Sequence, residues 1–420
     1  MHILVVHQYY LHKEDAGGSR WNQFAKYWSR SGHKITVLAG MVHYATGKKQ
    51  PEYKGKFVVR ERETENIEVL RCYVSESYNK SFVGRFWAYI SFVFSTILAG
   101  LFCTDKCDVI ICTSPPLTVG LTGWALSKLK KTPMVFEVRD LWLESFIDMG
   151  LIKNRLVIKF MCSIQKIIYK SAKWINVLTP AFEEFLVNVN GVPKNKISMI
   201  PNGADLDIIK PGPKDNWVRD KHCLGDKFIV TYVGAHGITN KLTQLIEAAN
   251  ILKEKDPDVQ VMFIGDGIRK PQLKEKAAEL GLDNLTFVDS VPKNVIVDYI
   301  AASDVCTAVL GKLELFKAVY PNKVFDYMAA ARPIIIGIDG VAKKLVEDAR
   351  AGIYVEPENP KEFVEAVLKL KANPKLCNEY GENGLNFVKK NFDRAILADR
   401  YIDILQNKVS RDFDVKRTYH

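Results

Sequence analysis

The feature that most constrains the fold is a repeated alternation of short β-rich runs and amphipathic segments in both halves of the chain. The runs of the first half lack the polar alternation of a sheet with one exposed face, so they are predicted to be strands covered on both faces. They lie at 3–6, 35–39, 109–113, 134–138 and 175–178, separated by helical segments that include 20–31, 117–130 and 156–171. This order predicts a parallel, doubly wound sheet.

The second half repeats the scheme after a junction rich in proline and glycine. Its predicted strands are 228–233, 259–264, 285–288, 305–309 and 333–338, and its predicted helices are 241–252, 272–280, 321–331 and 360–371. A chain of 420 residues exceeds what one core accommodates. We therefore predict an α/β protein with two doubly wound, Rossmann-like domains facing a cleft, where the carboxyl ends of parallel strands bind ligands.

The predicted domains differ in charge. They are residues 1–204 and 205–392, followed by 393–420 as a C-terminal helix that crosses back to the first domain, and a tail. Residues 1–200 hold 27 Lys and Arg against 16 Asp and Glu, whereas residues 201–420 hold 32 of each. A basic first half predicts contact with phosphate groups or an anionic membrane. Nucleic acid is not expected as a partner, because zinc-finger spacing, an RNA-binding sheet signature and a dense arginine block are all missing.

The cysteines and the N-terminus predict a cytoplasmic protein with reduced thiols. Eight cysteines are spread along the chain, and Met1 runs almost directly into a strand-like run, without room for a secretion signal. The spacing of Cys103 and Cys107 would place them on one helix face, but no second pair has the spacing of a zinc site. We therefore expect buried, small apolar residues and no metal.

One segment departs from the domain pattern because it contains no charged residue from Phe86 to Thr104. Its length reaches the lower limit for crossing a bilayer, about 17 to 25 residues. Crossing would place the flanking strands on opposite sides of the membrane, so we expect a helix that lies on the sheet and inserts aromatic residues among anionic headgroups. A fully buried core helix is the alternative.

Two glycine loops precede predicted helices and are candidates for binding an anionic ligand. Gly17 and Gly18 follow the first strand. Glycines let backbone N–H groups approach a ligand, and a helix N-terminus carries about half a positive charge. The candidates in the loop after the first strand of the second domain are Gly234, His236, Gly237 and the following Lys241. A plain turn for the first loop and a solvated surface amine for the lysine are the alternatives.

The stretch 320–330, Tyr-Pro-Asn-Lys-Val-Phe-Asp-Tyr-Met-Ala-Ala, is the most informative for nucleotide binding. Pro321 suits the first position of a helix, which places Lys323 in the first turn, where the helix dipole favours anions. Asp326 lies three residues on, on the same face. A lysine over a diphosphate and a carboxylate under a ribose are what nucleotide binding requires. The alternative is an exposed acid and base on an ordinary helix.

A charged and aromatic stretch follows the predicted strand 134–138 of the first domain. Arg139, Asp140 and Glu144 are expected to face the cleft from the carboxyl end of that strand. They are candidate catalytic residues, because a carboxylate at this place orients or deprotonates an acceptor hydroxyl. A local salt bridge with Arg139 is the alternative.

Together these motifs make the chain similar to glycosyltransferase family 4, whose members have the GT-B fold and retain the configuration of the transferred sugar. The resemblance rests on the two similar domains, the Pro-Asn-Gly-Ala-Asp junction at 201–205, the Gly-Asp-Gly loop at 265–267 and the Pro-x-Lys-x-x-Asp-Tyr-Met-Ala stretch at 321–329. The Arg-Asp-Leu-Trp stretch at 139–142, with Glu-Ser at 144–145, resembles the branch that builds O-antigen and capsule repeat units.

The resemblance implies a transfer without metal or cofactor from a nucleotide sugar, expected to be a UDP-linked N-acetylated amino or deoxyamino sugar. The implied acceptor is an undecaprenyl-diphosphate-linked saccharide. Lys323 and the loop 233–237 would hold the diphosphate, Asp326 the ribose, and Gly17 and Gly18 would lie near the leaving phosphate. A lipid-linked acceptor agrees with the basic first half, and places the protein peripherally on the inner face of the cell membrane.

Three positions depart from the family pattern. Ala318 stands eight residues before Asp326, where a second acid is usual, and Ala235 replaces an arginine in the glycine loop. The histidine that many relatives place after a first-domain strand is not evident, and Arg139 and Asp140 occupy that region. A UDP-sugar 2-epimerase with the same fold and a non-catalytic sugar-nucleotide-binding subunit are the alternative functions.

Overall fold

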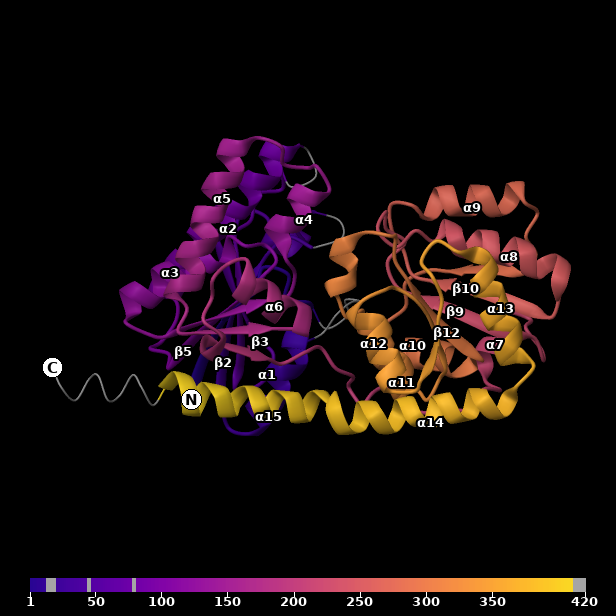
Figure 1. The fold of residues 1–420 in the computed structure, drawn as a ribbon. Coiled ribbons are helices and arrows are strands. Elements are labelled where there is room, and N and C mark those ends of the chain that lie inside the picture. Colours follow the sequence, from indigo (N-terminus) through magenta and orange to yellow (C-terminus); the bar gives the residue numbers. More distant parts are fainter. Residues whose placement is uncertain (13–19, 44–46, 78–80, 411–420) are drawn as a thin grey trace. The chain divides into compact units, whose positions relative to one another are not determined.

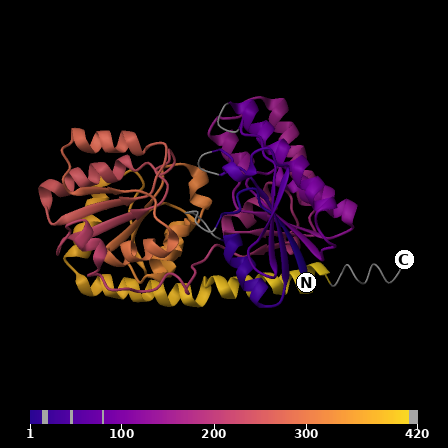
Figure 2. The same ribbon diagram turned by 180° about the vertical axis from the view of Figure 1, so that it is seen from behind.

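The chain folds into two compact α/β units, each built on its own sheet (Figure 1; Figure 2 shows the ribbon from behind). The computed structural model describes residues 1–12, 20–43, 47–77 and 81–410. Of these, unit 1 contains the residues up to 201 and those from 395 onward, and unit 2 contains residues 202–394. The predicted fold class, two doubly wound parallel sheets, is confirmed.

The sheet of unit 1 has eight strands in the order β3-β4-β2-β1-β5-β6-β7-β8, parallel apart from the antiparallel pair β3 and β4. The strands are β1 (His2–Val6), β2 (Lys34–Gly40), β3 (Val58–Arg62), β4 (Ile67–Cys72), β5 (Val109–Thr113), β6 (Met134–Val138), β7 (Trp174–Val177) and β8 (Ile197–Met199). The helices are α1 (Arg20–Arg30), α2 (Phe82–Phe102), α3 (Val119–Lys130), α4 (Trp142–Asp148), α5 (Arg155–Ser171), α6 (Pro180–Asn188) and α15 (Arg394–Ile404).

Helices cover both faces of this sheet, which explains why its central strands are mostly apolar. Every residue of β5 and β6 is buried. On one face α1 packs against α15, where the Trp28 and Tyr401 rings lie 5.6 Å apart and Trp28 Nε1 donates to Ala398 O. On the other face α3 lies between α2 and α5, because Gly100 and Gly120 leave space for Leu126 and Ile168.

The sheet of unit 2 has six parallel strands in the order β11-β10-β9-β12-β13-β14. The strands are β9 (Phe228–Val233), β10 (Val259–Ile264), β11 (Leu285–Val288), β12 (Val305–Val309), β13 (Ile334–Gly337) and β14 (Gly352–Tyr354). The helices are α7 (Trp217–Lys221), α8 (Thr243–Lys255), α9 (Lys270–Glu279), α10 (Lys293–Ala302), α11 (Asn322–Ala329), α12 (Val341–Asp348), α13 (Pro360–Lys371) and α14 (Pro374–Asn391).

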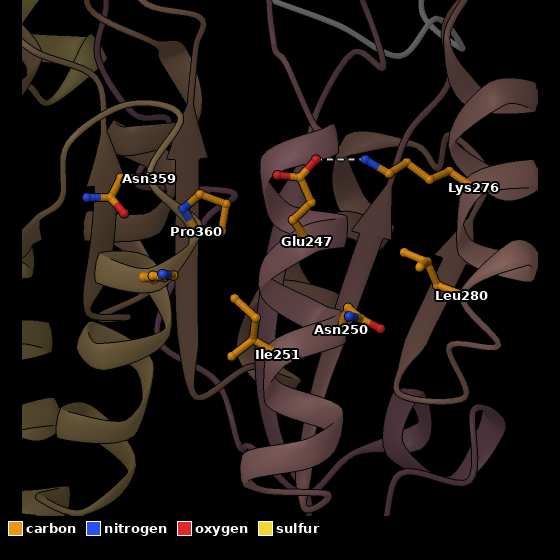
Figure 3. A pocket seen from close by; sticks show the side chains of 8 residues that line it. Glu247, Asn250, Ile251, Lys276, Leu280, Asn359 and Pro360 are labelled. Carbon is orange, nitrogen blue, oxygen red and sulfur yellow. Dashed lines mark hydrogen bonds and ion pairs between the residues drawn. The ribbon is translucent and has the colours of Figure 1, made fainter.

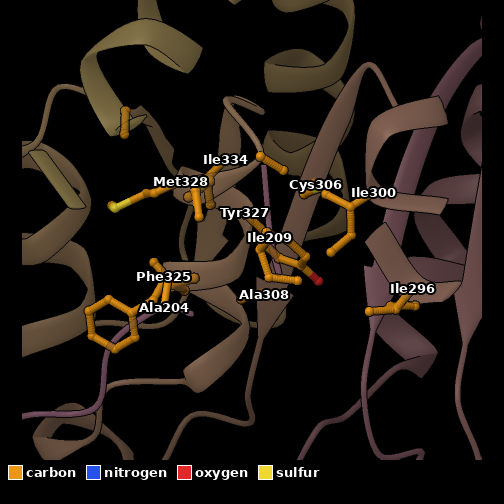
Figure 4. Packing of buried hydrophobic residues seen from close by; sticks show 14 of the residues in the cluster. Ala204, Ile209, Ile296, Ile300, Cys306, Ala308, Phe325, Tyr327, Met328 and Ile334 are labelled. Carbon is orange, nitrogen blue, oxygen red and sulfur yellow. The ribbon is translucent and has the colours of Figure 1, made fainter. Parts of the chain in front are cut away.

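The core of unit 2 fixes the position of α11, the helix that carries Lys323 and Asp326. Figure 4 shows Phe325, Tyr327 and Met328 of this helix packed among residues of β12 and β13. The Tyr327 hydroxyl also accepts a hydrogen bond from Val233 N at the end of β9. The helix is therefore anchored by its buried face, and its first turn is held at the edge of the sheet.

The uncharged segment forms α2, which begins earlier than the predicted 86–104 because Ser81 caps the helix by accepting a hydrogen bond from Gly84 N. By length and composition α2 is apolar enough to cross a membrane, and 50% of its most apolar window is buried inside the unit. It connects β4 to β5 of one sheet. In this fold α2 is a surface layer of unit 1, with one buried face and one exposed face. The edge strands β3, β8 and β14 were not predicted.

A buried ion pair joins the start of α1 to the centre of the sheet of unit 1. Arg20 Nη2 lies 3.0 Å from Glu137 Oε2, and the two side chains are 2% and 0% exposed. The guanidinium also donates to Ile200 O and Pro201 O, and Asn176 Nδ2 donates to the same carboxylate. These bonds satisfy both charges and hold the last residues of unit 1 against the sheet.

We expect Glu137→Ala to destabilise unit 1 by about 3 to 5 kcal/mol, because it leaves the Arg20 charge buried without a partner. Thermal or urea unfolding measures the change. The control is Asp105→Ala, which removes the exposed ion pair with Lys34 and should cost far less, because water screens exposed charges. Equal losses in the two variants would contradict the structural role of the buried pair.

Candidate functional site

Two loops at the carboxyl edge of the sheet of unit 2 pack backbone to backbone. The loop 234–237 follows β9, and the loop 265–267 follows the neighbouring strand β10. A Cβ at Gly265 would lie 2.1 Å from Gly234 O, and a Cβ at Gly267 would lie 2.5 Å from His236 O. Both glycines also have positive φ angles, 139° and 158°. Only glycine fits at these two positions, so the glycines serve loop packing.

His236 lies in the first loop with its side chain fully buried. Its ring lies 6.0 Å from that of Phe263 and 6.4 Å from that of Phe287, and neither ring nitrogen has a hydrogen-bond partner in the described chain. Desolvation, and then the charge of Lys270, lower the pKa of His236 to about 4. The ring is thus neutral at physiological pH, and the residue can reach a ligand only through its backbone.

Lys323 lies in the first turn of α11, as the sequence predicts. Its Nζ lies 3.6 Å from the centre of the Tyr232 ring, a cation–π contact, and would lie 2.8 Å from a Cβ at Gly234. No carboxylate of the described residues pairs with it, and desolvation lowers the pKa of this amine to about 7. The structure therefore brings Lys323 together with the glycine loop, as a half-buried amine that an anion would complete.

Asp326 follows one turn later and is half-buried beside a charged cluster. Burial raises the pKa of its carboxyl group, and the charges of Lys293 and Arg394 oppose the rise. These two cations pair with Asp205, Arg394 Nη1 at 2.7 Å from Asp205 Oδ2. The cluster was missed by the sequence analysis because Arg394 is remote in the chain. No described hydrogen bond engages the Asp326 side chain, so its carboxylate is available to a hydroxyl.

Lys241 is exposed and precedes α8 in a left-handed conformation, with φ at 48°. A Cβ at Gly311, just after β12, would lie 2.9 Å from Lys241 Cγ. Since β12 pairs with β9, Lys241 is held at the same edge of the sheet as the glycine loop. No contact between Lys241 and Lys323 is found in the described part of the chain.

A positioning residue of this edge, Lys270, was missed by the sequence analysis. Its buried Nζ donates to Gly265 O at 2.8 Å and contacts Asp289 Oδ1 at 2.5 Å. It therefore ties the loop 265–267 to the end of β11. The sequence signal that could have identified Lys270 is its position at the start of a helix, directly after a Gly-Asp-Gly loop.

In unit 1 the residues Arg139 and Asp140 directly follow β6, and His7 directly follows β1. Desolvation and the charges of Arg139 and Arg71 hold the pKa of buried His7 well below its usual value, so it is neutral. Desolvation raises the pKa of Asp140 to about 6, against the charge of Arg139. Asp140 is exposed, so water moderates this rise. The sequence analysis did not name His7 as a candidate site residue, although it directly follows the first predicted strand.

Glu144 does not join this group through any described contact. It lies on α4, and its Oε1 accepts a hydrogen bond from Gln165 Nε2 of α5 at 3.0 Å. Glu144 stays a catalytic candidate from the sequence, and the structure shows its carboxylate in contact with α5. The candidates Gly17 and Gly18 lie outside the described residues. Among the described residues no cluster of three His, Cys, Asp or Glu side chains is placed to hold a metal ion.

A separate groove of unit 2 lies between helices rather than at the strand ends. Figure 3 shows it lined by Glu247 and Asn250 of α8, Lys276 of α9 and the first residues of α13. Glu247 and Lys276 form an ion pair of 2.7 Å across it. None of the predicted site residues lines this groove.

The two parallel-sheet α/β units define the class of proteins with the GT-B fold. Residues 16–203 match the family "Glycosyl transferase 4-like domain", and residues 214–387 match "Glycosyl transferases group 1". The two matches together span most of the chain. The chain therefore belongs to glycosyltransferase family 4.

Curated relatives are distant. The chain is 24% identical over 262 residues to an uncharacterized glycosyltransferase of Methanocaldococcus jannaschii, covering 61% of this chain and 64% of that protein. It is 28% identical to the α-D-kanosaminyltransferase of Streptomyces kanamyceticus, covering 44% and 47%, and 22% identical to the O-antigen chain mannosyltransferase C of Escherichia coli, covering 69% and 80%. The chain thus spans about half to two thirds of the first two relatives.

Solved structures share the fold at low sequence identity. Sucrose-phosphate synthase from Thermosynechococcus elongatus has a TM-score of 0.76 at 17% identity, covering 96% of this chain and 98% of that chain. HepE of Anabaena, in complex with UDP and glucose, has a TM-score of 0.71 at 16% identity, covering 96% and 99%.

We expect Gly265→Ala to destabilise unit 2 by more than about 2 kcal/mol, because its Cβ would collide with a backbone oxygen that cannot move aside. The control is Gly281→Ala, which also has a positive φ but no atom closer than 3.8 Å and should cost about 1 kcal/mol. Thermal unfolding compares them. If both variants lose the same stability, the close loop packing is wrong.

Proposed function

We propose that the protein is a retaining glycosyltransferase that moves a sugar from a UDP-sugar to a lipid-diphosphate-linked saccharide, in the assembly of bacterial O-antigen or capsule. The observation that carries the proposal is Lys323, a half-buried amine without a carboxylate partner in the described chain, held beside the glycine loop of a glycosyltransferase group 1 domain. A buried cation of this kind is stabilised by an anion, and a diphosphate supplies one.

The chemistry requires the bond between the sugar C1 and the diphosphate oxygen to break while C1 bonds to the acceptor oxygen. Negative charge develops on the leaving diphosphate, so Lys323 and the N-terminus of α11 stabilise the transition state more than the ground state. Asp326 accepts a hydrogen bond from the ribose. We assign attack to the face from which the diphosphate departs, with the acceptor proton passing to its oxygen, which retains the configuration. No metal or cofactor takes part in this proposal.

We propose the nucleotide from the ligands of proteins with the same fold, and we propose the acceptor from the sequence. HepE of Anabaena is described with UDP and glucose, which supports a UDP-sugar. The kanosaminyltransferase and the O-antigen mannosyltransferase support an amino sugar and a polysaccharide product respectively. We assign the acceptor to unit 1, with Arg139 binding its diphosphate and Asp140 orienting its hydroxyl. The lipid tail of an undecaprenyl-type acceptor fits peripheral attachment of α2 to the inner face of the cell membrane.

Lys323 gives sugar-nucleotide binding a defined pH dependence. Its pKa of about 7 means that the amine is mostly charged below neutral pH and mostly neutral above it. An anionic diphosphate binds the charged form, so affinity for UDP-glucose should fall up to about tenfold per pH unit between about pH 7 and 9. His236, with a pKa of about 4, stays neutral throughout. Calorimetric titration at several pH values measures the affinity.

The matched variants for this titration are Lys323→Met and Lys255→Met, the second removing an exposed lysine at the end of α8. We expect Lys323→Met to bind weakly with a flat profile and Lys255→Met to keep the wild-type profile. If the affinity of Lys323→Met for UDP-glucose depended on pH as in the wild type, Lys323 would not be the residue that binds the diphosphate.

Transfer itself is tested with UDP-sugars in the presence and absence of a short-chain polyprenyl-diphosphate saccharide. We expect UDP release only with the acceptor, and a product whose anomeric configuration matches the donor by NMR. Asp326→Ala should weaken donor binding about tenfold to a hundredfold, since a charge-assisted hydrogen bond contributes about 1.5 to 3 kcal/mol. Asp283→Ala, an exposed acid of unit 2, is the control.

Two results would replace the proposal. Conversion of the donor sugar without an acceptor would indicate a UDP-sugar 2-epimerase. Tight UDP binding without turnover, for a full set of acceptors and donors, would indicate a non-catalytic subunit.

A further inference from the structure

Helix α2 buries hydroxyl side chains together with part of its apolar side chains, and it leaves a further stripe of apolar side chains exposed. Ser95 Oγ donates to Tyr73 O at 2.7 Å, and Thr96 Oγ1 lies 2.9 Å from Thr122 Oγ1 of α3. The outward stripe includes Val83 and Trp87, which are 74% and 58% exposed. A helix that only packed on its own sheet would have polar side chains on its exposed face.

Helix α5 carries a second exposed apolar stripe, and this one is bordered by lysines. Leu156 is 78% exposed and Phe160 59% exposed, and Ile167 continues the stripe at helical spacing. The lysines on the exposed part of the same helix are Lys159, Lys166 and Lys170. Residues 149–173 contain six Lys and Arg and no Asp or Glu. Such a helix has the composition of an interfacial helix that lies on an anionic membrane.

The two stripes belong to one helical layer. Helix α3 packs between α2 and α5 through Gly100 and Gly120, and it adds Trp124 and Leu129 to the exposed apolar side chains. The layer is visible on unit 1 in Figure 1. Both α2 and α5 begin on the side of the sheet where strands β4 and β6 end, which is also where Arg139 and Asp140 lie.

We infer that α5 is a second membrane-docking element, which supplies the electrostatic attraction to anionic lipid while α2 supplies aromatic insertion. Opposite charge favours a bilayer rich in acidic headgroups. A second copy of the chain fits the surface poorly, because a two-fold contact through this layer would bring the lysines of α5 toward each other. Docking on both helices brings the carboxyl edge of unit 1 close to the headgroups. That consequence rests on the proposed function, since it is useful only for a lipid-linked acceptor.

The test is co-sedimentation of the full chain with phosphatidylcholine vesicles, with and without phosphatidylglycerol. We expect binding that depends on phosphatidylglycerol and falls at high salt. The triple variant Lys159→Gln, Lys166→Gln and Lys170→Gln should lose about fivefold in partitioning per lysine, about a hundredfold in all. The double variant Leu156→Ser and Phe160→Ser should lose about tenfold or more, because inserted apolar surface is removed.

The matched controls change similar side chains elsewhere. Val189→Ser removes an exposed apolar residue at the end of α6, and a triple change of Lys375, Lys389 and Lys390 to Gln removes three exposed lysines of α14. Both controls should partition like the wild type, and all variants should keep their melting temperature because the altered side chains are exposed.

The outcomes separate the rival explanations. If the α5 variants bind vesicles like the wild type while Trp87→Ser does not, α5 is not a docking element. If the wild type is a dimer without vesicles and the Leu156 and Phe160 changes make it monomeric, the surface contacts a second copy instead. Transfer to a water-soluble acceptor should be unchanged in the α5 variants. A wild type that binds vesicles as expected but transfers no sugar would refute the proposed function and leave the docking surface standing.

Discussion

The structure depends on buried charges that hold the chain where it leaves each unit. Arg20 pairs with Glu137 inside unit 1 and donates to the carbonyls of Ile200 and Pro201, the last residues before the chain enters unit 2. In unit 2, Arg394 pairs with Asp205, and its backbone N–H donates to Ala204 O. Charges without water are costly unless fully paired. The ends of both units are therefore held to their own cores by specific contacts rather than by loose linkers.

The cost of burying a charge also applies to the candidate donor site. There the half-buried cation Lys323 has no carboxylate partner among the described residues. Close packing of the two glycine loops places Gly234 beside Lys323, and Lys270 holds the second loop from beneath. Burial removes water from the amine of Lys323, and the amine instead contacts the face of the Tyr232 ring. A cation–π contact replaces only part of the lost hydration. This unbalanced charge at the edge of the sheet is the basis on which we propose a diphosphate as the ligand.

The exposed helical layer of unit 1 relates the charge asymmetry of the sequence to a surface. The excess of basic residues in the first half is not spread evenly, because α5 and its neighbours hold six of them without an acid. Helix α2, which has no charged residue after Arg85, lies in the same layer. Attraction to headgroups and insertion of aromatic rings are separate contributions to membrane binding, and our docking proposal assigns them to different helices.

The alternation of strands and helices and the place of Lys323 in the first turn of its helix were predictable from the sequence, because each follows from local periodicity or from a proline. Tertiary structure alone decided that His236 is buried between Phe263 and Phe287, that Glu144 bonds to Gln165, and that Arg20 meets Glu137. These contacts join residues 21 to 117 positions apart. The local sequence pattern indicates which face of a helix or strand is apolar. The packing of whole helices and strands determines which side chains contact one another.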